Sequence, residues 1–184
     1  MTVPEGIAAI GDHAFYHNNV VETITVPASV ESVGRYAFSG CDNLHQVCFA
    51  SGLKKLGDRA FFHSHTIETI VLPEGLNEIG EGAFLGCHAL RTIQLPQSVK
   101  HIGKSAFMYY KALEQAILSV NLRRIEKETF FLCEKLTHID LPTNLEYIGE
   151  KAFYRCPCEN MIVKKYLHLY QTDEKKKKLF GLSE

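Results

Sequence analysis

The chain has 184 residues and a nearly balanced charge, with 20 basic against 21 acidic side chains and a formal net charge of −1. Its 46% hydrophobic content is typical of a folded protein and excludes general disorder. The balanced charge argues against a protein that binds nucleic acid or anionic membrane through its overall field. No apolar run approaches the roughly 18–20 residues that cross a bilayer. Six cysteines are too few for a scaffold built on disulfides.

The sequence is one unit of 23 residues repeated seven times without insertion or deletion. Proline or a substitute opens each unit, at Pro4, Pro27, Ala50, Pro73, Pro96, Ser119 and Pro142. Two aliphatic columns follow, which are Ile7, Val30, Leu53, Leu76, Val99, Leu122, Leu145 and Ile10, Val33, Leu56, Ile79, Ile102, Ile125, Ile148. An Ala-Phe pair comes next, and only Thr129-Phe130 departs from it. A unit this short cannot bury its own apolar face, so the pattern predicts a solenoid whose coils share one core.

The last third of each unit predicts a β-strand, because apolar residues alternate with outward-facing ones. Examples are Val47-Cys48-Phe49, Ile70-Val71-Leu72, Ile93-Gln94-Leu95 and Ile139-Asp140-Leu141. Proline then ends the strand, since it has no N–H to donate to the ladder. Parallel pairing at about 4.8 Å per coil predicts a sheet roughly 29 Å long.

Glycine follows the second aliphatic column in six of the seven units, at Gly11, Gly34, Gly57, Gly80, Gly103 and Gly149. We interpret this column as a turn with positive φ, which a Cβ atom would penalise by about 1–2 kcal/mol. Glu126 replaces the glycine in the sixth unit, where Thr129 also replaces the alanine. The two departures predict a local distortion of the sixth coil.

The repeat resembles the BspA-like class of leucine-rich repeats, whose unit has the form LxxIxLPxSVxxIGxxAFxxC. Residues 90–107, LRTIQLPQSVKHIGKSAF, match its first eighteen positions, and the slots recur in phase from Pro4 to about Lys164. The chain lacks the asparagine ladder of other leucine-rich repeats. The resemblance implies a right-handed, β-rich superhelix with a parallel sheet on its concave face. It also implies an adhesion-type module of a secreted or surface protein from bacteria or some protozoa, with no catalytic residues.

The repeats are predicted to occupy residues 1–164 and a C-terminal cap or tail residues 165–184. Tyr166, Leu169 and Tyr170 have helical spacing, which predicts a short helix that covers the last coil. Lys175 to Lys178 form a basic run, for which a solvated tail is favoured over a contact with an anionic surface.

The first residues are expected to enter the repeat already in register, and no signal-peptide pattern is visible among them. A trimmed chain and a cytoplasmic protein are both consistent with this. The first coil has no polar cap, so its sheet edge is expected to be available for pairing with another copy.

Cys41, Cys87, Cys133 and Cys156 share one slot and are predicted to be small buried core residues rather than metal ligands or disulfides. Two coils separate Cys41 from Cys87, which is about 10 Å and beyond bridging reach. Adjacent coils permit a Cys133–Cys156 bond by distance, although parallel side-chain vectors disfavour it. The Cys156-Pro-Cys158 spacing is too short for a zinc knuckle.

Histidines and carboxylates give no catalytic constellation, so neither an enzyme nor a cofactor is predicted. His65 and His88 share a slot, with side chains expected about 5 Å apart. They lack a third ligand on the same ridge, and chance stacking is the favoured interpretation. His138 and Asp140 face outward from one strand, but no nucleophile lies within reach.

The outer face of the predicted concave sheet is the leading candidate for a ligand site, because it carries almost no charge before the last coil. Its two rows are Thr23, Gln46, Thr69, Thr92, Gln115, His138 and Thr25, Cys48, Val71, Gln94, Ile117, Asp140. The sequence therefore predicts a non-enzymatic module that binds protein or glycan, although threonine and valine also simply suit strands. The alternative is an intracellular scaffold or a self-assembling repeat protein.

Two further surfaces stand out. Each Ala-Phe pair is followed by Tyr16, Ser39, Phe62, Leu85, Met108, Phe131 or Tyr154, for which packing between coils is favoured over a docking strip. Lys100, His101, Arg123 and Arg124, with Lys104 and Lys127 nearby, form a basic ridge. It has no aromatic platform beyond Tyr147, so nucleic acid is not expected as a partner.

Overall fold

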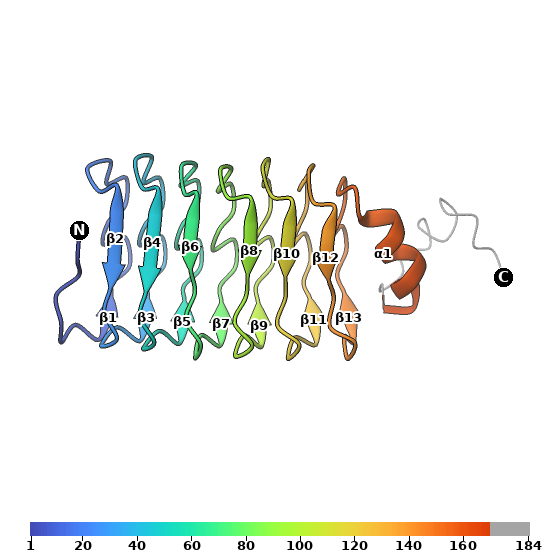
Figure 1. Ribbon diagram of the computed structural model, residues 1–184, viewed down its shortest axis with the longest axis horizontal. Coiled ribbons are helices and arrows are strands. Elements are labelled where there is room, and N and C mark those ends of the chain that lie inside the picture. The colour runs from blue at the N-terminus through green and yellow to red at the C-terminus, as the bar shows by residue number, and fades with distance from the viewer. Residues whose placement is uncertain (170–184) are drawn as a thin grey trace.

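Phenylalanine rings stack along the centre of the molecule, one from each repeat unit. The computed structural model describes residues 1–169, and in it neighbouring rings lie 5.0–5.6 Å apart between centroids from Phe15 to Phe153. The six rings after Phe15 are almost fully buried. The predicted solenoid is confirmed, because the coils follow one another along a single axis and share this core (Figure 1).

The longer strands of the coils form the main sheet, in which all pairing is parallel. They are β2 (Thr23–Val26), β4 (Gln46–Phe49), β6 (Thr69–Val71), β8 (Thr92–Gln94), β10 (Gln115–Ile117) and β12 (His138–Asp140). The first coil joins this sheet only through a bridge between Thr2 and Thr25. The alternation predicted from the sequence is confirmed, since Val47 and Phe49 are buried and Cys48 between them faces outward.

Two-residue strands form the minor sheet along another side of the solenoid (Figure 1). They are β1 (Ala9–Ile10), β3 (Ser32–Val33), β5 (Lys55–Leu56), β7 (Glu78–Ile79), β9 (His101–Ile102), β11 (Arg124–Ile125) and β13 (Tyr147–Ile148). The second aliphatic column supplies the inward residue of each strand.

Each sheet is interrupted once within the described residues. The main sheet divides into β2-β4-β6 and β8-β10-β12, and the minor sheet divides into β1-β3-β5-β7-β9 and β11-β13. The second interruption lies beside Glu126. The predicted distortion of the sixth coil is therefore confirmed, and it takes the form of a broken strand ladder.

The interpretation of the glycine column as a positive-φ turn is wrong. None of its six members has positive φ. A Cβ added to Gly103 would lie 2.5 Å from the backbone nitrogen of Glu81 in the preceding coil, and one added to Gly80 would lie 2.6 Å from that of Asp58. Glycine is required here because two backbones approach closely, not because the chain turns left-handed.

Positive φ occurs instead in two other columns on either side of the Ala-Phe pair. The first contains His13, Tyr36, Arg59, Gly82, Ser105, Glu128 and Lys151, and the second contains His17, Gly40, His63, Gly86, Tyr109, Leu132 and Arg155. Most of these residues carry a Cβ atom, so every coil except the fourth, which has Gly82 and Gly86, holds backbone strain that stacking must offset.

The C-terminal cap is the helix α1 (Glu159–Tyr166), followed by a 3₁₀ turn at Leu167–Leu169. The cap therefore begins before the expected boundary between residues 164 and 165. Ile162 and Val163 are buried against the last coil, whereas Tyr166 and Leu169 are only half-buried there. The helix covers the last coil as predicted, but earlier residues do most of the packing. Tyr170 and the basic run at Lys175–Lys178 lie outside the described residues.

Candidate binding surfaces

The outer face of the main sheet brings the predicted site residues together in two continuous rows. Strand pairing aligns Thr23, Gln46 and Thr69 in one half, and Thr92, Gln115 and His138 in the other. All six side chains are exposed. In the second row Thr25, Val71, Gln94 and Asp140 are exposed, while Cys48 and Ile117 are half-buried. The structure thus places every predicted residue on one face.

A hollow of about 550 Å³ interrupts this face where β6 and β8 fail to pair. Its lining residues are Glu68, Thr69, Ala89, Arg91, Thr92 and Ala112. Thr69 and Thr92 belong to the predicted rows, whereas Glu68 and Arg91 were missed. Both flank a strand on its N-terminal side, and no break in the repeat pattern marks this junction in the sequence.

His138 and Asp140 do not form a working acid–base pair. The Nδ1 atom of His138 lies 2.8 Å from the Thr137 hydroxyl, and within residues 1–169 no hydrogen bond or ion pair joins the ring to Asp140. Both residues are exposed. Their position at the end of the main sheet fits a polar border of a binding face.

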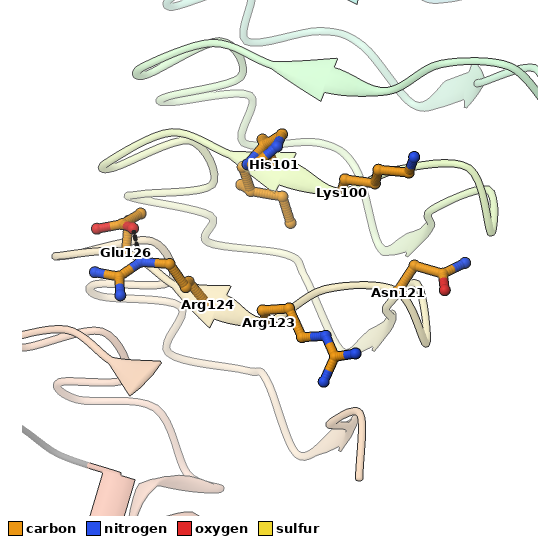
Figure 2. Close-up of a pocket in the computed structure, with 7 residues that line it drawn as sticks. Lys100, His101, Asn121, Arg123, Arg124 and Glu126 are labelled. Atoms are coloured by element: carbon orange, nitrogen blue, oxygen red, sulfur yellow. Dashed lines mark hydrogen bonds and ion pairs between the residues drawn. The ribbon is translucent and has the colours of Figure 1, made fainter. Parts of the chain in front are cut away.

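A second hollow, of about 360 Å³, lies in the minor sheet between β9 and β11. It is lined by Lys100, His101, Ile102, Asn121, Arg123, Arg124 and Glu126 (Figure 2). Four residues of the predicted basic ridge therefore line one cavity, namely Lys100, His101, Arg123 and Arg124. Arg124 donates to Glu126 at 2.9 Å, and its guanidinium lies 3.9 Å from the centre of the Tyr147 ring.

The cysteines that share one slot of the repeat are buried core residues, as predicted. The thiols of Cys41, Cys87, Cys133 and Cys156 are buried, and each donates to the carbonyl of a phenylalanine in the preceding coil at 2.9–3.2 Å. The Ser64 hydroxyl makes the same bond to Phe38. All six cysteines are free thiols. Burial raises the pKa of Cys41 to about 11 and that of Cys87 to about 12, so both thiols stay protonated.

Three histidine rings meet on the edge of the third and fourth coils. His65 stacks on His88 with centroids 4.6 Å apart, which confirms the predicted proximity, and His63 lies 5.1 Å from His65. Burial, followed by the neighbouring His65 ring, lowers the pKa of His63. Burial is also the largest cause that lowers the pKa of His88, while a hydrogen bond with the Tyr109 carbonyl opposes it. Within the part of the chain that the structure describes, no cluster of three or more ligating side chains suits a metal ion.

The stripe that follows the Ala-Phe pairs is mostly half-buried. Tyr16 and Tyr154 at its ends are exposed by 49% and 39%, whereas Ser39 is buried. Phe131 stacks on Tyr154 at 5.2 Å between centroids. Packing between coils therefore accounts for most of this stripe. Across residues 1–169 no helix is long and apolar enough to cross a bilayer.

Comparison with known proteins gives one consistent picture of the fold. The leucine-rich repeat protein TpLRR of T. pallidum is 28% identical, with a TM-score of 0.86 over 93% of this chain and 84% of its own. A leucine-rich repeat protein from Bacteroides ovatus is 25% identical, with a TM-score of 0.69, and the match spans 85% of this chain but only 49% of that protein. The pneumococcal vaccine antigen PcpA, at 18% identity and a TM-score of 0.50, shares the fold alone.

Curated protein sequences contain no significant match to this chain. The sequence model described as the BspA type leucine rich repeat region matches six copies, over residues 1–75 and 54–173. These two ranges overlap and together include nearly all of the repeat units. The chain belongs to the BspA-type leucine-rich repeat family.

Proposed function

We propose that this protein is a non-enzymatic binding module that recognises a protein or glycan through the outer face of its main sheet. Membership of a family that is typically non-enzymatic supports a binding role, and likeness to leucine-rich repeat proteins of bacteria supports a place at the bacterial cell surface. The ligand-binding residues of this proposal are the two rows of the main sheet.

The observation that carries the proposal is the hollow between β6 and β8. Elsewhere on this face, before the last coil, the two rows form an uncharged surface that consists mainly of threonine, glutamine and aliphatic side chains. At the hollow, the Thr69 and Thr92 hydroxyls lie beside the charged Glu68 and Arg91. Arg91 is 78% exposed and lies 3.9 Å from Glu114, so its guanidinium keeps most of its donors available. A ligand can bind there through neutral hydrogen bonds and one charged anchor.

The test is capture of ligands from host-cell proteins, matrix proteins and a glycan array. A Thr69→Lys/Gln94→Lys variant places one charge in the lining of the hollow and one on the adjoining face while leaving every core residue in place. Its matched control is Ser51→Lys/Thr143→Lys, which adds the same charge at exposed turn positions. A ligand held by the wild type and the control but lost by the face variant supports the proposal. Equal capture by all three proteins overturns it.

A second candidate function is self-association through the first coil. A mostly apolar hollow of about 240 Å³ is exposed there, with Met1, Val3, Ile7, Ile10 and Phe15 among its lining residues. The edge of β1 that does not pair with β3 is open to another strand. Light scattering across a concentration series tests this: assembly should appear in the wild type and be lost in Ile7→Lys/Ala9→Lys. A wild type that stays monomeric throughout contradicts it.

A further inference from the structure

Glu126 separates the fifth and sixth coils on the minor sheet. At the equivalent position of the fifth coil, Gly103 N–H donates to Ile79 at 2.8 Å, and in the seventh coil Gly149 N–H donates to Ile125 at 2.8 Å. Such bonds require the two backbones to approach so closely that a Cβ would collide with the preceding coil. Glu126 carries a Cβ, so β9 and β11 cannot reach this distance and their ladder is broken. The hollow is the space that results.

The separation leaves backbone donors without partners at the edge of β11. In the ordered coils, N–H groups at these positions donate to the coil before, as Lys54 and Lys55 do to Glu31. The equivalent bonds from Arg123, Arg124 and Glu126 to the fifth coil are absent. Since local strand geometry is repeated, these N–H groups face the hollow. Arg123 and Arg124 are exposed and Glu126 is half-buried, so these N–H groups can donate to an acceptor that enters the hollow.

Side-chain charge at this junction also differs from that of its neighbours. Lys55 of the third coil pairs with Glu78 of the fourth at 2.9 Å, and Arg123 of the sixth pairs with Glu146 of the seventh at 3.3 Å. Across the hollow, by contrast, Lys100 occupies the same column as Arg123. Lys100 and Arg123 are therefore like charges at equivalent positions of adjacent coils, and an anion placed between them would be attracted to both.

The cationic groups around the hollow keep free donors. Within residues 1–169 the ammonium group of Lys100 has no ion pair or hydrogen bond. The Arg123 and Arg124 carboxylate pairs are largely exposed and use only part of each guanidinium. Figure 2 shows Lys100, Asn121 and Arg123 grouped at one end of the hollow, with Arg124 directed toward Glu126 at the other. At the first end, Arg123 uses one guanidinium nitrogen for Glu146 and the Asn144 carbonyl, and the Asn121 amide nitrogen donates to the Gln97 carbonyl at 2.7 Å. The ammonium group of Lys100 and the remaining N–H groups of Arg123 and Asn121 are the donors left for an anion.

We propose that this hollow is a binding site for a tetrahedral oxyanion, either a free phosphate or sulfate ion or the phosphate or sulfate group of a sugar. Lys100 and Arg123 supply the charge, and the Asn121 amide and the β11 N–H groups supply neutral donors. Such a mixture of cations and backbone N–H groups is the usual chemistry of oxyanion recognition in proteins. A volume of 360 Å³ is within the range of small-ligand sites and admits a monosaccharide with its charged group.

The test is an NMR titration of the ¹⁵N-labelled chain with inorganic phosphate, inorganic sulfate, glucose 6-phosphate and glucose 6-sulfate, with glucose as the neutral control. Saturable shifts of the Arg123, Arg124 and Glu126 amides with at least one of the four anions support the site. The anion that binds most tightly identifies the source of the oxyanion.

The Lys100→Gln/Arg123→Gln variant should bind that anion at least about tenfold more weakly, because hydrogen bonds to charged groups contribute about a factor of ten in affinity. The matched control, Lys54→Gln/Lys55→Gln, removes the same charge from an ordered part of the sheet and should bind as the wild type does.

Glu126→Gly separates a built site from a mere concentration of charge. This variant removes a negative charge but lets the fifth and sixth coils close. If the hollow is the site, the variant should lose anion binding. If charge alone attracts the anion, the variant should bind it more tightly. Glu126→Ala keeps the Cβ that separates the coils and should retain binding. The proposal would be overturned if Glu126→Gly bound the anion as tightly as the wild type or more tightly. It would also be overturned if Lys100→Gln/Arg123→Gln and its control, Lys54→Gln/Lys55→Gln, lost the same amount of affinity.

Discussion

The buried hydroxyl of Thr129 donates a hydrogen bond of 2.7 Å to the backbone carbonyl of Glu126. These are the only two residues that depart from the glycine and alanine columns in the sixth unit, and the bond joins them directly. A buried hydroxyl would be destabilising without such a partner. The sixth coil therefore accommodates both substitutions together, and its strand β11 does not pair with β9 of the fifth coil.

Removal of one ring from the phenylalanine stack should be severely destabilising. Phe84 is almost fully buried between Phe61 and Phe107. Phe84→Ala is expected to lower the free energy of unfolding by about 3–5 kcal/mol. Phe62→Ala, at a half-buried position, is the control and should cost clearly less. Chemical denaturation measures both, and equal losses would show that the stack is not the core.

Two substitutions in the seventh coil test whether glycine is needed for close backbone approach at position 149 and whether positive φ strains position 151. Gly149→Ala should destabilise the protein by about 1–3 kcal/mol, because its Cβ would press against the backbone of Lys127. Lys151 has a φ of 55° and is exposed. Lys151→Gly should therefore raise the melting temperature by relieving left-handed strain. A fall in melting temperature for Lys151→Gly would contradict this assignment of strain.

Stability should fall in mild acid because of the histidine cluster. The pKa values of His63 and His88 are lowered from the ordinary 6.5, chiefly by burial, so the folded state holds fewer protons than the unfolded state below that pH. The contribution of the two neutral rings to the free energy of unfolding is complete above about pH 6.5, the pKa of an unfolded histidine. It is lost as the pH falls through their lower folded-state pKa values. His63→Gln/His88→Gln should show a smaller drop in melting temperature between pH 7.5 and pH 5 than the wild type. His45→Gln, at an exposed position outside the cluster, should behave as the wild type does.

Thiol reactivity should single out one cysteine. Cys48 is the only half-buried cysteine, and the other five are buried. Because the thiolate is the reactive form, the raised pKa values of Cys41 and Cys87 protect them further. Mass spectrometry after brief labelling of the native protein should find modification at Cys48 first. Rapid labelling of Cys87 would show that the core opens readily.

The repeat pattern was sufficient to predict the core and the rows of the main sheet. Each apolar column lies in the interior because every coil has the same length, so a slot in the sequence is a fixed position in space. The left-handed columns could not be predicted in this way. They contain residues as different as Tyr36, Glu128 and Leu132, and their φ values are imposed by the stacking of coils rather than by residue type.

The two hollows could be predicted only in part. The sequence indicated both the basic ridge and the replacement of glycine by Glu126, but not that these features surround the same space. The interruption between β6 and β8 has no signal in the repeat pattern, since Thr69 and Thr92 occupy their slots in the usual way. Both sites depend on the distance between coils, which is a property of the stacked structure.

Amide hydrogen exchange at position 126 tests the central structural claim, that Glu126 holds two coils apart. In the wild type this amide should exchange much faster than those of Gly103 and Gly149, which are hydrogen bonded to the preceding coil. In Glu126→Gly it should become as protected as they are, and the melting temperature should rise. Protection of the wild-type amide equal to that of Gly103 and Gly149 would show that the ladder is continuous and that Glu126 opens nothing.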